Sequence, residues 1–143
     1  MIFYKFYLIF ILNISFVYCR IYDKCTLAKE LLNKYQFPKD QISTWICIVE
    51  HESNYNTAAE NTASHDNGLF QISQIYWCDQ APNKGCNKPC SSFRDDNIDD
   101  DVSCVKTIFG DFQKREGNGF KAWTTYDAYC NKDTNDYISN CGL

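Results

Sequence analysis

Residues 45–73 read WICIVEHESNYNTAAENTASHDNGLFQIS, and their hydrophobic pattern changes from helical to strand-like partway along. Apolar residues recur at helical spacing after Pro38, at Ile42, Trp45, Ile46 and Val49. A polar segment follows, in which Asp66-Asn67-Gly68 has the chemistry of a turn, and residues 68–73 form a strand-like run. The pattern therefore predicts an amphipathic helix followed by a small hairpin or sheet.

Helical patterns lie on both sides of this segment. Residues 23–35 have apolar positions at helical spacing, and so does the segment from about Asp99 to the stop at Gly117. A shorter helix is expected at about residues 120–128. Helices, then a small sheet, then more helices predict an α+β architecture, and no repeat or linker divides residues 20–143.

Length and composition exclude several classes of protein. The chain has 143 residues, of which 45% are hydrophobic and 16% aromatic, and its net charge is −4. Such a chain can bury enough surface to fold, so intrinsic disorder is excluded. A strongly basic nucleic-acid-binding protein is excluded by the charge, and no nucleic-acid partner is expected.

Residues 1–19 have the pattern of a secretory signal peptide: a cation at Lys5, an apolar run over 6–12 and a small residue at Cys19. A membrane anchor is the alternative, but the apolar run is shorter than the ~20 residues that span a bilayer. We therefore expect a secreted, extracellular chain of residues 20–143 without a membrane partner. Its net charge would be −5, because Lys5 is the only charged residue removed.

The cysteines also indicate an oxidising compartment. Eight of the nine follow residue 19, at Cys25, Cys47, Cys78, Cys86, Cys90, Cys104, Cys130 and Cys141. An even number in a small secreted domain predicts disulfides, but eight cysteines allow 105 pairings, so counting leaves the connectivity open. A zinc site is the alternative, yet no CxxC pair is present and neither histidine completes a familiar ligand spacing.

Two acidic residues have contrasting expected environments. Glu52 lies on the apolar face of its helix near the C-terminal end, where desolvation and the helix dipole both raise the pKa of a carboxyl group. Asp66 lies among short polar residues that can hold an ionised carboxylate. One protonated acid and one carboxylate are what glycosidic bond cleavage requires. For each acid the alternative is an ordinary surface role, at a helix end or in a turn.

The chain resembles the c-type lysozymes, and its helical segment at residues 45–53 is most similar to that of the arthropod members. The similarity covers residues 20–143 and rests on Glu52-Ser53-Asn54-Tyr55-Asn56-Thr57, Asp66-Asn67-Gly68-Leu69-Phe70-Gln71-Ile72 and Tyr76-Trp77-Cys78. It implies a helical domain, a small antiparallel β-sheet subdomain and an active-site cleft between them. It also implies four disulfides, which join Cys25 to Cys141, Cys47 to Cys130, Cys78 to Cys90, and Cys86 to Cys104.

The resemblance assigns roles to individual residues. Glu52 would be the general acid and later the base, and Asp66 would be the nucleophile or charge stabiliser of a retaining mechanism, as lysozymes of this family use. It implies a core position for Trp45 and substrate-binding positions for Tyr76, Trp77, Glu116, Trp123 and Ser73. Asn67 and Ser73 depart from the family, which usually has Tyr and Asn there.

The segment between Cys90 and Cys104 contains five aspartates in seven residues. Like charges at this density favour neutralisation by a hard divalent cation, although one or two acids at a helix N-terminus need no cation. The spacing resembles the calcium loop of α-lactalbumin and of the calcium-binding lysozymes. That similarity implies carboxylate ligands from Asp95, Asp100 and Asp101 and backbone carbonyl ligands from Ser92 and Asn97.

The expected function is that of a muramidase without a catalytic cofactor, which hydrolyses the β-1,4 bond between N-acetylmuramic acid and N-acetylglucosamine in peptidoglycan. Chitin oligosaccharides are a second expected substrate, and the protein is expected to be a monomer. Its negative charge favours a digestive role at acidic pH over an antibacterial role at neutral pH, because peptidoglycan is itself anionic. The alternative is a non-catalytic, calcium-stabilised carbohydrate-binding protein.

Overall fold

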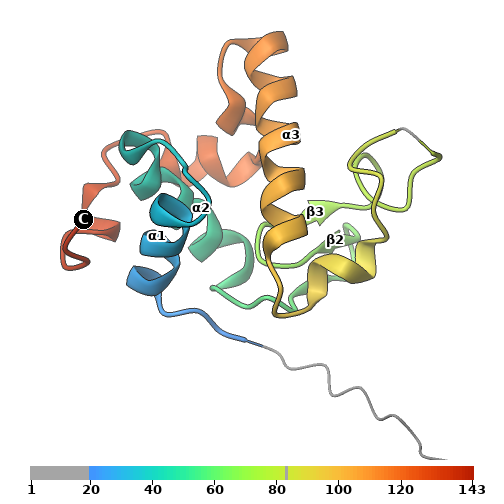
Figure 1. Cartoon of the computed structure of the whole chain (residues 1–143). Helices are drawn as coiled ribbons and strands as arrows, with labels where there is room; N and C mark the ends of the chain where they lie inside the picture. Colours follow the sequence, from blue (N-terminus) through green and yellow to red (C-terminus); the bar gives the residue numbers. More distant parts are fainter. Residues whose placement is uncertain (1–19, 83) are drawn as a thin grey trace, which may run out of the picture.

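Three α-helices build most of the molecule: α1 (Lys24–Asn33), α2 (Ile42–Ser53) and α3 (Asp99–Glu116) (Figure 1). The computed structural model describes residues 20–82 and 84–143, so the expected signal peptide, residues 1–19, lies outside the described part. In Figure 1, α1 and α2 lie on one side of α3 and the small sheet on the other. This arrangement confirms the predicted α+β fold.

Local signals in the sequence set the helix ends. The side chain of Asp23 caps α1 by accepting a hydrogen bond from the backbone N–H of Thr26 at 2.9 Å. Helix α2 is followed by Asn54 and α3 by Gly117, with φ of 50° and 72°. Both residues have the left-handed conformation that commonly ends a helix. The predicted stop at Gly117 is confirmed.

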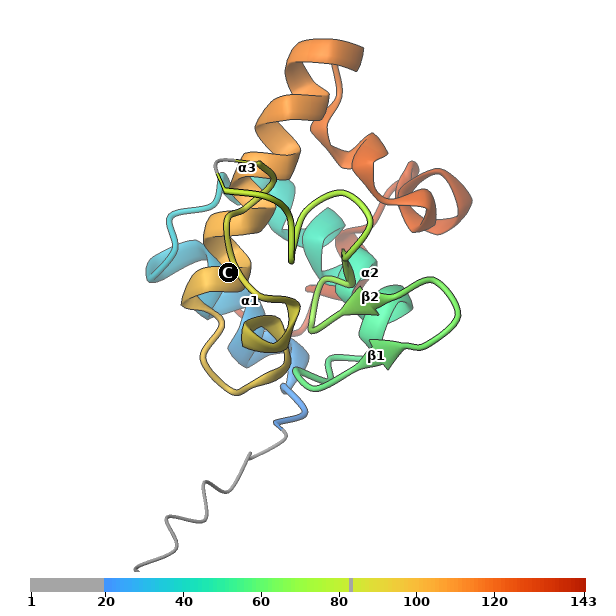
Figure 2. The ribbon, with the colours of Figure 1, turned by 90° about the vertical axis from the view of Figure 1, so that its right-hand side faces the viewer.

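The sheet has three antiparallel strands in the order β1 (Glu60–Asn61), β2 (Asp66–Asn67) and β3 (Ile72–Ser73) (Figure 2). A small sheet was predicted, but its boundaries were wrong. Asp66 and Asn67 were expected in a turn, whereas they form β2 and pair on both edges. The turn lies at residues 68–71, where Leu69 and Phe70 are buried as core residues.

The helix predicted at residues 120–128 is in fact two short helices. These are η3 (Gly119–Ala122) and the π-helical η4 (Tyr126–Cys130), and the chain is extended at Trp123 between them. Apolar periodicity could not reveal this break, because Trp123 is buried like a helical core residue although its backbone is not helical. The remaining short helices are η1 (Lys39–Gln41), η2 (Cys90–Arg94) and η5 (Asn135–Tyr137).

Four disulfides hold these elements together. They join Cys25 to Cys141, Cys47 to Cys130, Cys78 to Cys90, and Cys86 to Cys104. These are the four pairs that the family resemblance implies. The first two fix the C-terminal segment to α1 and α2, and the last two fix the loop after β3 to η2 and α3. Each constrains the unfolded chain more strongly than the folded one.

Trp45 lies at the centre of the hydrophobic core, where only 1% of its surface is exposed. Its ring contacts five other aromatic rings, with centroid distances from 4.9 to 6.1 Å: Phe37, Phe70, Phe109, Phe120 and Trp123. These rings come from the connection between α1 and η1, from the β2–β3 turn, from α3 and from the segment after it. Trp45 therefore joins the helices to the sheet.

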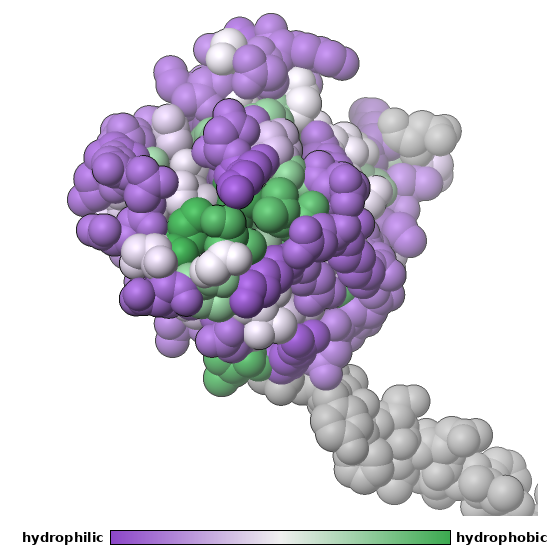
Figure 3. All heavy atoms as spheres, turned by 60° about the vertical axis from the view of Figure 1, so that its left-hand side comes forward, coloured by the Kyte–Doolittle hydropathy of each residue, from purple (hydrophilic) through white to green (hydrophobic). Residues whose placement is uncertain are grey.

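The surface is largely hydrophilic on the face that Figure 3 turns forward, with a hydrophobic area near the centre of the view. Large hydrophobic side chains that are clearly exposed include Ile21, Ile75, Tyr76 and Tyr129. Within residues 20–82 and 84–143, no helix has the length and apolar character needed to cross a membrane.

Replacing Trp45 with Ala should lower the free energy of unfolding by about 3–5 kcal/mol, because the change removes the shared centre of the aromatic core. Chemical denaturation with far-ultraviolet circular dichroism measures this loss. Trp77→Ala is the matched control: Trp77 is only partly buried and should cost much less. Equal losses for the two variants would contradict the central role of Trp45.

Candidate active site

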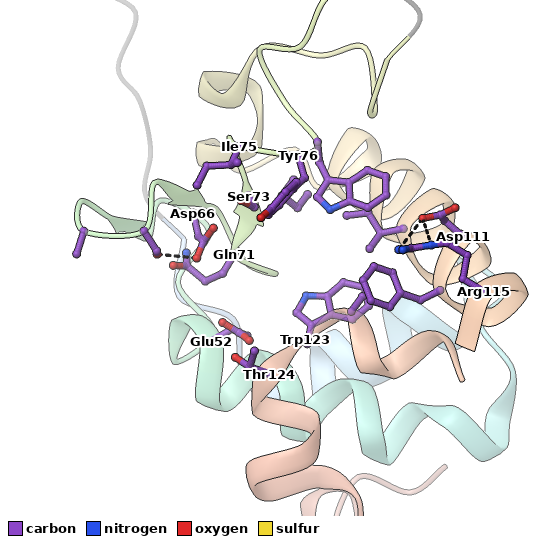
Figure 4. A pocket seen from close by; sticks show the side chains of 17 residues that line it. Glu52, Asp66, Gln71, Ser73, Ile75, Tyr76, Asp111, Arg115, Trp123 and Thr124 are labelled. Atoms are coloured by element: carbon purple, nitrogen blue, oxygen red, sulfur yellow. Dashed lines mark hydrogen bonds and ion pairs between the residues drawn. The ribbon is translucent and has the colours of Figure 1, made fainter. Parts of the chain in front are cut away.

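A cavity of about 930 Å³ opens between the sheet and the helices. Its walls come from the end of α2, from residues 63–77, from one face of α3 and from residues 122–124. Figure 4 shows Glu52 and Asp66 together at one end of this cavity and Asp111 and Arg115 at the other, with Tyr76 and Trp123 between the two ends. The structure thus brings both acids predicted from the sequence to one cavity.

Glu52 is held in the cavity wall by the last turn of α2. Burial raises the pKa of its carboxyl group above the ordinary value. The hydroxyl of Thr125 donates a hydrogen bond to Glu52 Oε1 at 2.7 Å, which lowers the pKa, and the negative charge of Asp66 raises it again. The net direction is upward, so Glu52 retains a proton at higher pH than an exposed glutamate.

The break between η3 and η4 brings Thr125 to Glu52. Residues 123–125 connect the two short helices, and Thr125 lies 73 residues from Glu52 in the chain. Sequence analysis missed Thr125, because nothing in the pattern of that segment indicates which side chain faces α2.

Asp66 has a polar environment on the opposite wall. The hydroxyl of Ser64 donates a hydrogen bond to Asp66 Oδ2 at 2.6 Å, as expected of the short polar groups around this acid. Ser73 pairs with Asp66 across β2 and β3 and also lines the cavity. Asp66 thus has hydrogen-bonding polar neighbours, whereas Glu52 is buried at the end of α2.

The turn between β2 and β3 contributes Gln71 to the cavity lining. The indole N–H of Trp123 donates a hydrogen bond to the backbone carbonyl of Phe70 at 2.9 Å. The side-chain amide of Gln71 donates to the carbonyls of Gly68 and Ala59 at 2.9 and 3.3 Å. The Trp123 bond fixes this turn against the segment that holds Thr125, and the Gln71 bonds hold the turn to its neighbours in the sheet region.

Asn67, a departure from the family, is turned inward and is 2% exposed. Its amide donates hydrogen bonds to the carbonyls of His65 at 3.0 Å and Ile72 at 3.5 Å. It therefore stabilises the strand pair that carries Asp66, and it does not line the cavity. The strand assignment was missed because Asp-Asn-Gly more often forms a turn.

Tyr76, Trp77 and Trp123 all line the cavity, as does Ile75, which sequence analysis did not select. Tyr76 is 66% exposed, so its ring is accessible on the rim. Aromatic faces of this kind pack against the apolar faces of sugar rings. The lining is thus suited to a carbohydrate chain.

Glu116, the predicted distal contact, is not part of the cavity wall. It is the last residue of α3, whereas Asp111, Phe112 and Arg115 line the cavity from the preceding turns. A side chain one residue beyond Arg115 on a helix points about 100° away from it. The family resemblance that suggested Glu116 could not show this, because the face of α3 that meets the cavity is set by packing.

The aspartates between Cys90 and Cys104 differ in their partners. Asp95 accepts from the backbone N–H of Asn97 at 2.8 Å, Asp96 from the hydroxyl of Thr57 at 3.2 Å, and Asp99 pairs with Lys34 at 2.9 Å. The other two, Asp100 and Asp101, have carboxylate oxygens that are buried and form no hydrogen bond with the described residues.

Asp101 is the most unusual of these acids. It is 1% exposed, and burial together with the charges of Asp100 and Asp95 raises its pKa to about 9. An unpartnered buried carboxylate is costly unless it is neutralised. Among the described residues, however, no three His, Cys, Asp or Glu side chains gather closely enough to form a metal site by themselves. A cation here would therefore also need the backbone carbonyls that the resemblance implies, from Ser92 and Asn97.

A match to known proteins agrees with this geometry. Residues 20–141 match the model of the C-type lysozyme/alpha-lactalbumin family. The chain is 36% identical to lysozyme C of the donkey Equus asinus, and the match covers 87% of this chain and all of the relative. It is 35% identical to lysozyme C of the shrimp Penaeus merguiensis, with 85% of this chain and 82% of the relative covered.

Solved structures of similar proteins have the same fold. The crystal structure of a lysozyme from the shrimp Litopenaeus vannamei has a TM-score of 0.74 and 35% identity, and the match covers 87% of this chain and 98% of that one. Canine milk lysozyme has a TM-score of 0.70 and 34% identity, with 87% and 99% covered. The chain therefore belongs to the C-type lysozyme/alpha-lactalbumin family.

Proposed function

We propose that this protein is a secreted muramidase that cleaves the β-1,4 bond between N-acetylmuramic acid and N-acetylglucosamine in peptidoglycan, and also cleaves chitin oligosaccharides. The observation that carries the proposal is the placement of two carboxyl groups in one cavity with opposite environments. Glu52 has a raised pKa because it is buried, whereas Asp66 accepts a short hydrogen bond from Ser64. Names of relatives support the same activity.

In the proposed reaction, protonated Glu52 donates its proton to the oxygen of the leaving sugar. The Asp66 carboxylate attacks or stabilises the positively charged sugar carbon, and the configuration at that carbon is retained overall. Glu52, now ionised, then removes a proton from the water that completes hydrolysis. Both steps use side chains of the chain itself, so this proposal requires no catalytic cofactor.

A digestive role at acidic pH is the favoured biological setting. The chain from residue 20 onward carries a net charge of −5, so at neutral pH it is repelled by anionic peptidoglycan. The Thr125 hydroxyl also limits how far the pKa of Glu52 rises, which lowers the pH at which the general acid loses its proton. Four disulfides favour an extracellular location, and we expect a monomer.

We also propose a structural calcium ion at the aspartate loop, remote from the two catalytic carboxyl groups. Asp100 and Asp101 have buried oxygens without partners, and Ca²⁺ binds carboxylate and carbonyl oxygens. Asp95 would supply a third carboxylate, and Ser92 and Asn97 would supply backbone carbonyls. The ion would neutralise charge beneath the turn that follows Asp66, because the position that a Cβ of Gly68 would occupy is 3.0 Å from Asp101 Oδ1.

Replacing Glu52 with Gln should lower kcat for peptidoglycan by about 10³-fold or more, because an amide cannot donate the required proton. Release of reducing ends from soluble peptidoglycan measures this effect. Glu50→Gln is the control, since Glu50 accepts a hydrogen bond from Tyr55 and does not line the cavity, so its activity should remain within a few-fold. A wild-type protein that binds chitin oligosaccharides but cleaves neither substrate would refute the enzyme and favour a carbohydrate-binding protein.

Replacing Thr125 with Val should move the alkaline limb of the kcat–pH profile to higher pH. The hydroxyl stabilises the ionised form of Glu52, so its removal raises the pKa and keeps the acid protonated for longer. The profile is measured between pH 3 and 9 in parallel with Thr124→Val, which removes a hydroxyl that has no bond to Glu52. The interpretation fails if both variants leave the limb in place or if Thr125→Val moves it to lower pH.

Calcium should raise the thermal midpoint by roughly 5–15 °C over the protein in EDTA, because a ligand that binds only the folded state stabilises it. Asp101→Asn should remove this dependence on calcium. Asp96→Asn should retain it, because Asp96 is bonded to Thr57 and is not among the proposed ligands. The same midpoint for the wild type in calcium and in EDTA would disprove the site.

A further inference from the structure

The charges in the cavity wall are unevenly distributed. The described residues that line it include three carboxylates, Glu52, Asp66 and Asp111, and a single cation, Arg115. A substrate carboxylate that approached these walls without a positive partner would be repelled by each of these acids that is ionised. Among the described lining residues, Arg115 is therefore the one positively charged side chain that can attract a negatively charged part of a substrate.

Asp111 holds Arg115 in a defined orientation. Both residues are on α3, four positions apart, and Arg115 Nε and Nη2 each lie 3.0 Å from Asp111 Oδ2. The guanidinium carbon lies 4.4 Å from the centroid of the Phe112 ring. The Arg115 side chain is 54% exposed, so a ligand can reach it. Arg115 is thus positioned by its neighbours and accessible from the cavity.

The guanidinium group of Arg115 has N–H donors that Asp111 does not use. It carries five N–H groups in a planar fork, and Asp111 occupies only the edge formed by Nε and Nη2. The edge that includes Nη1 remains for a second acceptor. A planar fork of this kind matches the two oxygens of a carboxylate better than the separate hydroxyls of a neutral sugar.

We propose that Arg115 is a specificity-determining residue that selects glycans carrying carboxylates over neutral chitin. The inference rests on the proposed muramidase function, because only then does the cavity hold such a chain. Peptidoglycan offers carboxylates on its peptide stems and, where muramic acid carries no stem, a free carboxylate on the lactyl group, whereas chitin has neither. The shared chemistry is a carboxylate presented at the end of the cavity formed by α3.

The position of Arg115 determines which kinetic constant should respond. Figure 4 shows Arg115 and Glu52 at opposite ends of the cavity, so the guanidinium group does not touch the reacting bond. A contact that is equally strong in the bound substrate and in the transition state changes KM and leaves kcat unaltered. The effect of Arg115 should therefore appear in KM.

The test compares Arg115→Gln, Arg115→Lys and Lys114→Gln with the wild type. The substrates are soluble glycan strands with peptide stems, the same strands without stems, and chitin oligosaccharides. Lys114→Gln is the matched control, because it makes the same change of charge one residue away on α3 but outside the cavity lining.

We expect Arg115→Gln to raise KM for stem-bearing strands by about three- to tenfold, with kcat and the KM for chitin within twofold of wild type. Arg115→Lys should retain part of the preference, since it keeps the charge but loses the fork. A rise for stem-bearing strands alone identifies a carboxylate of the peptide stem, because the lactyl carboxyl group is an amide in those strands. A rise that extends to strands without stems shows that Arg115 also binds the free lactyl carboxylate.

Three results would overturn the proposal: the same rise in KM for chitin as for peptidoglycan, no rise for either substrate, or the same effect from Lys114→Gln. Failure of the muramidase function has a different signature, since the wild type would then cleave no substrate. In that case calorimetric dissociation constants for the same oligosaccharides replace KM, and the preference for carboxylates is tested by the same variants.

Discussion

The packing of Trp45 against Trp123 and Phe70 is the interaction on which the rest of the structure depends. Trp45 belongs to α2, whose last turn carries Glu52, and Phe70 belongs to the turn beside Asp66. A hydrogen bond from the indole N–H of Trp123 to the backbone carbonyl of Phe70 joins the other two residues directly. Both carboxyl groups are thus attached to one rigid aromatic cluster, although 14 residues separate them in the chain.

This cluster also accounts for the different environments of the two acids. Packing at the end of α2 removes water from Glu52, whereas the short strand β2 leaves Asp66 beside the hydroxyl of Ser64. Burial favours the protonated acid, and a donated hydrogen bond favours the carboxylate. The same fold therefore gives two acids in one cavity different surroundings, as the proposed reaction requires. The hydrogen bond from Thr125 lowers the pKa of Glu52, but by less than burial raises it.

Some of this could be predicted from the sequence, and the reasons differ from element to element. Helices α2 and α3 have long apolar stripes and clear stop residues, so their periodicity was sufficient. Strands of two residues have no periodicity, so the boundaries of β2 were missed. Glu52 and Asp66 were found because each is marked by its local context. Thr125 and Arg115 reach the cavity through tertiary packing, so no local pattern marks them. Glu116 was assigned from the family resemblance, which does not show which face of α3 meets the cavity.

The central claim is that Glu52 and Asp66 act together in a retaining hydrolysis. The most direct test is proton NMR of the products in the first minutes of cleavage of a chitin oligosaccharide, before the anomers interconvert. Retention predicts that the β-anomer is formed first and the α-anomer appears only later by mutarotation. Initial formation of the α-anomer would show inversion and contradict the role assigned to Asp66.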